Sequence, residues 1–325
     1  RLARQKAGGR RMKSGHFFVL MYSFSTCWNS HRHTDGRAML REIRDLGFEY
    51  AELSHGTRIS LLPGILEAVD AGEIRISSLH NFCPLPMGVN HSAPNLYQFS
   101  SERARERELA LRYTLKTLEL ASRVGASVVV LHLGSIEMKN HTDKLLEMLA
   151  RGQKDHLKYD RLCAEIEEKR QVRKGPFFER TCEALKQILP EAESRGVRLG
   201  IENRQSLEEL PLDSDFETLF KDLASPNLVY WHDTGHGQIK ENLGFTPHAR
   251  HVESLQHHLG GFHIHDVQFP GRDHCAPGEG SIDFPALKPF LKPDHIKVFE
   301  LGPSVSPEAV RRGVEHIKTL WGNSD

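Results

Sequence analysis

The chain has 325 residues, which allows either two ordinary domains or one large α/β barrel with a substantial core. Its 43 Lys and Arg residues balance its 43 Asp and Glu residues, so no overall field would draw it onto nucleic acid or anionic lipid. No run approaches the roughly 18 consecutive apolar residues that a membrane helix requires. Composition therefore argues against polyanion binding and membrane insertion.

The five cysteines are widely spaced, odd in number and contain no C-x-x-C pair. This usage argues against a disulfide framework or a structural zinc knuckle, and it favours a reducing, cytoplasmic compartment. Residues 1–16 carry six Lys or Arg residues and no acidic residue, and we expect them to form a disordered basic tail. An export signal is the alternative, but the apolar stretch that follows is short and lacks a clear cleavage site.

Strand-like runs alternate with helical patterns along the rest of the chain, which is typical of a parallel sheet with crossover helices. Eight runs are predicted as strands: Phe17–Tyr22, Tyr50–Leu53, Ile74–Leu79, Ser127–Leu131, Val197–Ile201, Leu228–His232, Gly261–Ile264 and Ile296–Phe299. Eight strands close a (β/α)₈ barrel. We therefore expect an α/β fold in which residues 17–325 form a single TIM barrel domain.

Helical patterns fill the segments between these strands. Three of them are predicted near Arg37–Leu46, Leu61–Ala71 and Glu308–Trp321. Ser101 is expected to cap a further helix, which Gly125 would end just before the fourth strand. Residues 139–174 are longer than one crossover and mix both charge signs, so we expect an inserted, solvated helical excursion after strand 4.

Metal-binding side chains end four of the predicted strands, in the order Glu202, Asp233, His265 and Glu300. Because these positions lie at the carboxyl ends of barrel strands, we expect them to meet at one mouth of the barrel. Three carboxylates clustered there would repel one another without a cation, which favours one bound divalent metal. The oxygen-rich donor set indicates Mn²⁺, Mg²⁺ or Co²⁺, and catalytic Zn²⁺ stays open.

Residues two apart in a strand point the same way, so the residue two positions before each of these four should face the barrel interior. These interior residues are predicted to be Gly200, Trp231, His263 and Val298. His80 and His132 end the third and fourth strands and would line the same mouth, either as substrate contacts or as structural groups. Glu52, at the tip of the second strand, is read as a surface residue rather than a sugar-binding one.

Five short motifs occur in a fixed order along the second half of the chain. They are Gly-Ile-Glu-Asn-Arg at 200–204, Trp-His-Asp-Thr-Gly-His at 231–236, His-Ile-His-Asp at 263–266, Pro-Gly-Glu-Gly at 277–280 and Phe-Glu-Leu at 299–301. Together they resemble the xylose isomerase-like TIM barrels and, within them, the sugar phosphate isomerase/epimerase group. The resemblance extends from about Phe17 onward and is strongest between Val197 and Gly302.

This resemblance implies a divalent-metal-dependent isomerase or epimerase that acts on a small sugar, sugar phosphate or related hydroxy-ketone through an ene-diolate. One metal ion would be held by the four strand-end residues, and Glu202 and Glu300 would also serve as the catalytic base and acid. The predicted substrate-binding residues are His236, His132, His80 and Arg272.

Three other functions stay open. A dehydratase acting on a keto-inositol or keto-acid would use the same site, and a non-catalytic barrel would bind a sugar without turnover. Apurinic-site nucleases of the endonuclease-IV type share many of these positions, but Arg272 stands where one of their zinc ligands is expected. We expect a small carbohydrate as the partner, with no nucleic acid or membrane partner, and homo-oligomerisation as an option.

Overall fold

The computed structural model describes residues 21–322. The basic tail predicted at residues 1–16, and all but the end of the strand predicted at Phe17–Tyr22, lie outside the described residues. Within residues 21–322, no helix combines the length and the apolar composition needed to cross a membrane.

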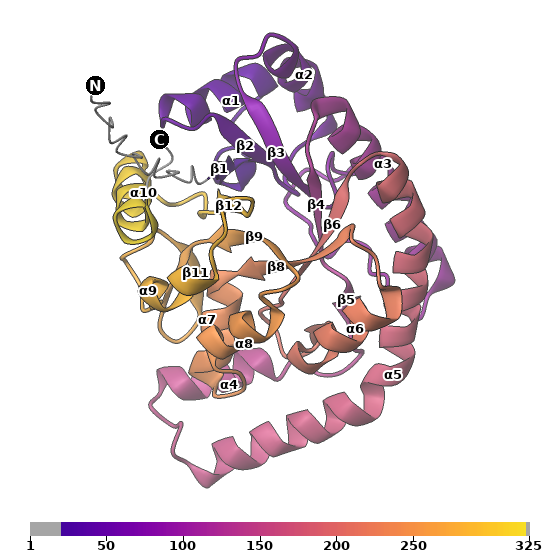
Figure 1. Ribbon diagram of the computed structural model, residues 1–325. Helices are drawn as coiled ribbons and strands as arrows, with labels where there is room; N and C mark the ends of the chain where they lie inside the picture. Colours follow the sequence, from indigo (N-terminus) through magenta and orange to yellow (C-terminus); the bar gives the residue numbers. More distant parts are fainter. Residues whose placement is uncertain (1–20, 323–325) are drawn as a thin grey trace, which may run out of the picture.

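Eight parallel strands close into one barrel, in the order β1-β12-β9-β8-β6-β4-β3-β2 (Figure 1). The strands are β1 Tyr22–Ser25, β2 Tyr50–Leu53, β3 Arg75–His80, β4 Val128–Leu131, β6 Arg198–Glu202, β8 Leu228–Asp233, β9 Leu259–Ile264 and β12 Ile296–Phe299. Neighbouring pairs are parallel throughout, with β1 pairing to both β2 and β12. The predicted (β/α)₈ barrel is confirmed.

Helices connect the strands around the outside of the barrel (Figure 1). The α-helices are α1 Gly36–Asp45, α2 Leu62–Asp70, α3 Ala104–Val124, α4 Thr142–Ala150, α5 Leu157–Ser194, α6 Phe216–Leu223, α7 Thr234–Leu243, α8 His248–Leu255, α9 Phe284–Leu287 and α10 Pro307–Trp321. The short 3₁₀ helices are η1 Thr26–Trp28, η2 Ile59–Leu61, η3 Asp213–Asp215 and η4 Lys288–Phe290. Two small antiparallel sheets pair β5 Gly134–Ser135 with β7 Glu209–Leu210, and β10 Asp266–Gln268 with β11 Arg272–Cys275.

Apolar side chains fill the interior of the barrel. Val128, Val130, Trp231, Ile296 and Val298 form this cluster, and each is buried. Gly261 makes room for the largest of them, because a Cβ at that position would lie 2.4 Å from the indole ring of Trp231. This packed cluster fills the barrel beneath the carboxyl ends of the strands, so the polar side chains at those ends lie on an apolar interior that excludes water.

The helix before β4 begins later than predicted. Ser101 is not its N-cap, because α3 starts at Ala104 and the Ser101 hydroxyl instead donates to Glu106 at 3.0 Å. The predicted end is confirmed: Gly125 is the C-cap, with a φ of 73° that favours glycine.

Residues 139–174, predicted to form an excursion, are largely helical and comprise α4 and the first part of α5. Figure 1 shows α5 running along the outside of the barrel and changing direction near its middle, where Pro176 lies inside the helix. A proline there removes one backbone hydrogen bond and bends a helix. The description of this segment as an insertion stays a prediction.

A buried ion pair links η3 to α7. Lys240 donates to one carboxylate oxygen of Asp213, and Thr246 donates to the other at 2.5 Å. Only 5% of the Lys240 side chain and 14% of the Asp213 side chain are exposed. Burial alone would raise the pKa of Asp213, but the charges of Lys240 and His251, together with the hydrogen bonds from Lys240 and Thr246, lower that pKa.

Replacing Asp213 with asparagine would leave the Lys240 ammonium buried without its counter-ion. We expect Asp213→Asn to lower the free energy of unfolding by about 3–5 kcal/mol in urea titrations. Asp70→Asn is the matched control, since Asp70 pairs with Arg123 at 2.7 Å with both side chains more than half exposed. That change should cost less than about 1 kcal/mol, and equal losses for the two variants would refute the importance of the buried pair.

Candidate metal and substrate site

Three carboxylates meet above the packed interior. Glu202 is the last residue of β6, Asp233 is the last residue of β8, and Glu300 directly follows β12. Their exposed fractions are 1%, 0% and 3%. Such burial is costly for anions unless a cation or hydrogen-bond donors offset their charge.

His263, from β9, lies among these carboxylates. Its Nδ1 is 2.8 Å from Glu202 Oε1, 3.0 Å from Glu300 Oε2 and 3.9 Å from Asp233 Oδ2. One ligand atom from each of these four residues lies within 4.8 Å of the others. Burial lowers the pKa of His263, but the surrounding carboxylates, Glu300 first, raise it well above its usual value. His263 therefore does more than fill the barrel, and its imidazolium balances part of the negative charge.

Glu52 closes the far side of His263. Its Oε2 lies 3.1 Å from Nε2 of His263 and accepts a 2.8 Å hydrogen bond from the Ser78 hydroxyl. Glu52 is fully buried, so the interpretation of it as a surface residue was wrong. Glu52 does lie near the end of β2, as predicted, but its side chain points toward His263 rather than toward solvent.

His265 and His236 gather around Asp233. Asp233 caps α7, because its Oδ1 accepts from the backbone N–H of His236 at 2.7 Å. Its Oδ2 lies 3.0 Å from Nε2 of His265, and this contact raises the pKa of His265 to about 9 against the lowering effect of burial. Gly235 permits this approach, since a Cβ there would lie 2.0 Å from the His265 ring. The Asp-Thr-Gly-His motif thus places two histidines beside one carboxylate.

His80 and His132 lie on the other side of Glu202. The Nε2 atoms of the two rings are 3.2 Å apart. Nε2 of His132 lies 2.6 Å from Glu202 Oε2, and Nε2 of His80 lies 3.6 Å from the same oxygen. Arg204 approaches the same oxygen at 2.9 Å and also binds Glu209 at 3.1 Å. Burial, reinforced by Arg204, lowers the pKa of His132 well below its usual value, so this imidazole is neutral.

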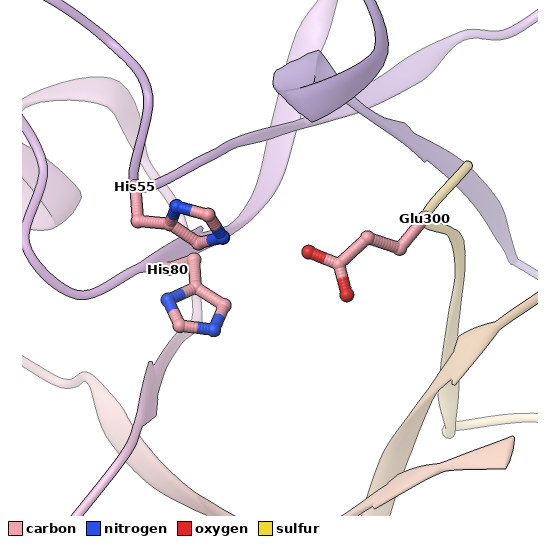
Figure 2. A group of neighbouring side chains, drawn as sticks. All are labelled: His55, His80 and Glu300. Carbon is pink, nitrogen blue, oxygen red and sulfur yellow. The ribbon is translucent and has the colours of Figure 1, made fainter. Parts of the chain in front are cut away.

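His55, which follows β2, completes this side of the mouth. Figure 2 shows His55 beside His80, with the carboxylate of Glu300 pointing toward both from the opposite side. The two imidazole rings meet edge to face at 4.6 Å, and Nδ1 of His55 is buried without a hydrogen-bond partner in the described residues. Burial, followed by the charge of His80, lowers the pKa of His55 well below its usual value. A neutral imidazole with a free nitrogen suits ligand or substrate binding.

Arg272 is the predicted site residue that lies apart from this cluster. Its side chain is exposed on β11 and donates to Gln268 at 3.3 Å. It lines an open cavity of about 480 Å³ together with His274. His274 links that cavity to the cluster, because its ring stacks on His265 at 4.2 Å and its Nδ1 lies 2.9 Å from the carbonyl oxygen of Glu300.

The donor set fits a divalent cation. Three buried carboxylates and one imidazole, that of His263, each offer a ligand atom within 4.8 Å of the others, and no cysteine takes part. Oxygen-rich donors with one or two imidazoles match Mn²⁺, Mg²⁺ or Co²⁺, and they are compatible with catalytic Zn²⁺. Because the three carboxylates are buried, their negative charge favours a bound dication, which would offset the part of that charge that His263 does not.

A model of the family described as xylose isomerase-like TIM barrel matches residues 40–320. The chain belongs to this family. Among curated proteins, the chain is similar to the uncharacterized protein MJ1614 of Methanocaldococcus jannaschii, with 25% identity over 262 residues, covering 80% of this chain and 84% of that protein.

Several solved structures share this barrel fold over most of the chain. A D-tagatose 3-epimerase-like protein has a TM-score of 0.66 with 19% identity, covering 93% of this chain and 97% of the other. A D-psicose 3-epimerase with D-tagatose, from Clostridium cellulolyticum H10, has a TM-score of 0.65 with 12% identity, covering 93% and 100%. The 3-keto-D-glucoside 4-epimerase YcjR of E. coli has a TM-score of 0.64 with 14% identity, covering 92% and 99%. These likenesses establish the shared fold.

Sequence reasoning found most of the residues that this xylose isomerase-like barrel brings together. It placed the three carboxylates, His80, His132, His236 and His265 at one mouth, and they lie there. It missed His55, Glu52, Arg204 and the central position of His263. His55 could have been found from the Leu-Ser-His sequence that ends the second strand, which repeats the pattern of the other strand ends.

Proposed function

We propose that this protein is a divalent-metal-dependent isomerase or epimerase acting on a small sugar, a sugar phosphate or a related hydroxy-ketone. The observation that carries the proposal is the convergence of Glu202, Asp233 and Glu300 with histidine at the barrel mouth. Family membership and the shared fold of several sugar epimerases support the same reaction class.

In this proposal, Glu202, Asp233, His265 and Glu300 hold the metal. Glu202 and Asp233 end their strands, and Glu300 and His265 directly follow theirs. Nε2 of His265 lies 3.0 Å from the Asp233 carboxylate. His263 lies two residues deeper in the same strand, against the Trp231 ring at 5.3 Å. When bound, the cation would polarise a carbonyl and its neighbouring hydroxyl and so acidify the C–H between them.

Glu202 and Glu300 are proposed to move the proton. They come from strands separated in the barrel by β8 and β9, so their carboxylates approach a bound substrate from different directions. One carboxylate would take the proton from the carbon and the other would return it, which inverts or relocates the stereocentre. His80, His132 and His236 are proposed to contact the substrate in the same space, and Arg272 is proposed to contact a longer substrate from the neighbouring cavity.

An apurinic-site nuclease is less well supported. Its zinc set would need a ligand at Arg272, which is an exposed cation bound to Gln268. The balanced charge of the chain also lacks the excess of Lys and Arg that drives binding to a phosphate backbone. A carbohydrate partner is therefore proposed, with no nucleic acid.

The compartment proposed is the cytoplasm. All five cysteines, Cys27, Cys83, Cys163, Cys182 and Cys275, are free thiols. Unpaired cysteines fit a reducing environment.

Deuterium exchange with solvent tests the reaction class. The Mn²⁺-loaded chain would be incubated in D₂O with D-tagatose, D-allulose, L-ribulose, their phosphates, inososes and keto-acids. We expect deuterium at the carbon beside the carbonyl of at least one compound, seen by NMR, and no exchange after chelation of the metal. Exchange accompanied by loss of water would identify the dehydratase alternative. Absence of label with every compound would contradict enolisation.

A further inference from the structure

The two carboxylate oxygens of Glu202 face two different surroundings. Oε1 lies 2.8 Å from His263, on the side of Asp233 and Glu300, where the proposed metal would bind. Oε2 faces away from it, toward His80 and His132. One ligand atom each from His80, His132 and Glu202 lies within 4.8 Å of the others, so these three residues form a second donor group beside the first.

Hydrogen bonding fixes the form of His132 in this second group. Asn95 donates its amide N–H to Glu209 at 3.1 Å, so its carbonyl oxygen faces Nδ1 of His132, 2.9 Å away. That carbonyl can only accept, and Nδ1 of His132 therefore carries the proton. Nη1 of Arg204, which can only donate, lies 2.6 Å from Nε2 of His132, so Nε2 keeps its lone pair. Two electron-rich atoms, Nε2 of His132 and Oε2 of Glu202, then lie 2.6 Å apart and need a positive group that contacts both of them.

Arg204 supplies that group. Its Nη1 lies 2.6 Å from Nε2 of His132 and 2.9 Å from Oε2 of Glu202, so its two N–H bonds satisfy both acceptors. The rest of the guanidinium is held from behind, because Nε and Nη2 donate to Glu209 at 3.3 Å and 3.1 Å. Only 7% of the Arg204 side chain is exposed. A planar, permanently charged fork suits such a two-sided contact, whereas a lysine offers a single point charge.

We propose that the Arg204 guanidinium takes the place of a second divalent cation at His80, His132 and Glu202, and so keeps the centre mononuclear. This inference rests on the proposed function, because it assumes that the first metal binds on the Oε1 side of Glu202. The guanidinium occupies the lone pairs that a second metal would need, and its charge adds to the cost of bringing a dication close. Arg204 is thus a specificity-determining residue, which favours proton transfer at one metal over hydrolysis at a metal pair.

The experiment removes the guanidinium and measures bound metal. Arg204→Met alone would leave Glu209 buried and unpaired, so Glu209→Gln is added to keep the charge balanced. Two imidazoles and a carboxylate make an open zinc site, so Zn²⁺ is the probe. After equilibration with Zn²⁺ and dialysis, we expect about one zinc per wild-type chain and about two per Arg204→Met/Glu209→Gln chain, by atomic emission.

Two further variants locate the second zinc. Adding His132→Ala to the double variant should return the content to that of wild type, because it removes one ligand of the second group only. Arg204→Lys, which keeps the charge, should also stay at the wild-type content. Melting curves verify that each variant is folded, and anomalous scattering from zinc-soaked crystals should place the extra ion between His80 and His132.

The outcomes separate this inference from the proposed function. A folded double variant that binds no more zinc than wild type would overturn the role of Arg204 and leave the first site intact. Two zinc ions in the wild-type chain would overturn it equally. A wild-type chain that binds no divalent metal at all would instead overturn the proposed function on which the inference rests.

Discussion

Glu202→Gln and Glu300→Gln should each reduce turnover by about 10²–10⁴-fold or more, the range expected when a general acid or base is lost. Each change keeps the size of the side chain and removes its charge and its basicity. Because both carboxylates are also proposed metal ligands, weaker metal binding would add to the loss. The measurement is the rate of product formation, or of deuterium exchange, on the substrate found in the D₂O panel.

Glu73→Gln is the matched control for this pair. Glu73 pairs with Arg37 and Arg41 in the turn before β3, at the opposite end of the barrel from the carboxyl ends of the strands. The same chemical change at that distance should leave turnover unchanged. Wild-type activity in Glu202→Gln or in Glu300→Gln would remove that glutamate from the proton transfer and assign the step to another group.

The fold followed closely from the sequence because strand and helix periods are local signals. Seven of the predicted strands overlap the observed ones within about two residues at each end, and the eighth falls partly outside the described residues. The largest shift is at β1, which ends at Ser25 rather than Tyr22, and the next largest is at β9, which starts at Leu259 rather than Gly261. Gly260 and Gly261 have low strand propensity, and only the neighbouring Val229 and Trp231 side chains explain why glycine is needed there.

The carboxylates of the site could be predicted because each is a polar residue at the end of an apolar strand, where a core position would not tolerate it. Alternation within a strand gave the direction of each side chain. Alternation could not distinguish a side chain that packs the barrel interior from one that belongs to the site, and His263 was therefore predicted to face the interior. Its partners Glu52 and Glu202 come from residues 211 and 61 positions away in the chain.

The role of Arg204 could not be predicted either, because its position also depends on residues that are distant in the sequence. Arg204 lies in a loop after β6, where an arginine is most often solvated, and its burial depends on contacts with Glu202, with His132 after β4 and with Glu209 of β7. Arg272 is a different case, because it lies exposed on β11 beside the neighbouring cavity, and its predicted contact with substrate stays a prediction. Loop residues take their orientation from tertiary packing, which no short-range pattern encodes.

The histidine ligand is the assignment on which the metal site depends most. His265 directly follows β9, level with a strand end, and contacts Asp233. His263 is deeper and contacts Glu202 and Glu300 on one side and Glu52 on the other. Under the proposed assignment, His265 is a ligand and His263 orients the carboxylates from below. The alternative assignment makes His263 the ligand. Each assignment places one imidazole on the metal, so the two differ in which histidine substitution removes the metal.

His265→Ala should therefore weaken Mn²⁺ binding by more than about 100-fold, whereas His263→Ala should weaken it by about 10–100-fold, the usual cost of losing a group that orients a ligand. Titration calorimetry with Mn²⁺ on the folded variants measures the difference, and melting curves verify folding, because His263 is fully buried and its loss leaves a cavity. The reverse order, with His263→Ala losing Mn²⁺ and His265→Ala retaining it, would assign the ligand to His263. Glu52 would then be the carboxylate that accepts from the second nitrogen of a metal-bound imidazole, an arrangement common around bound metals.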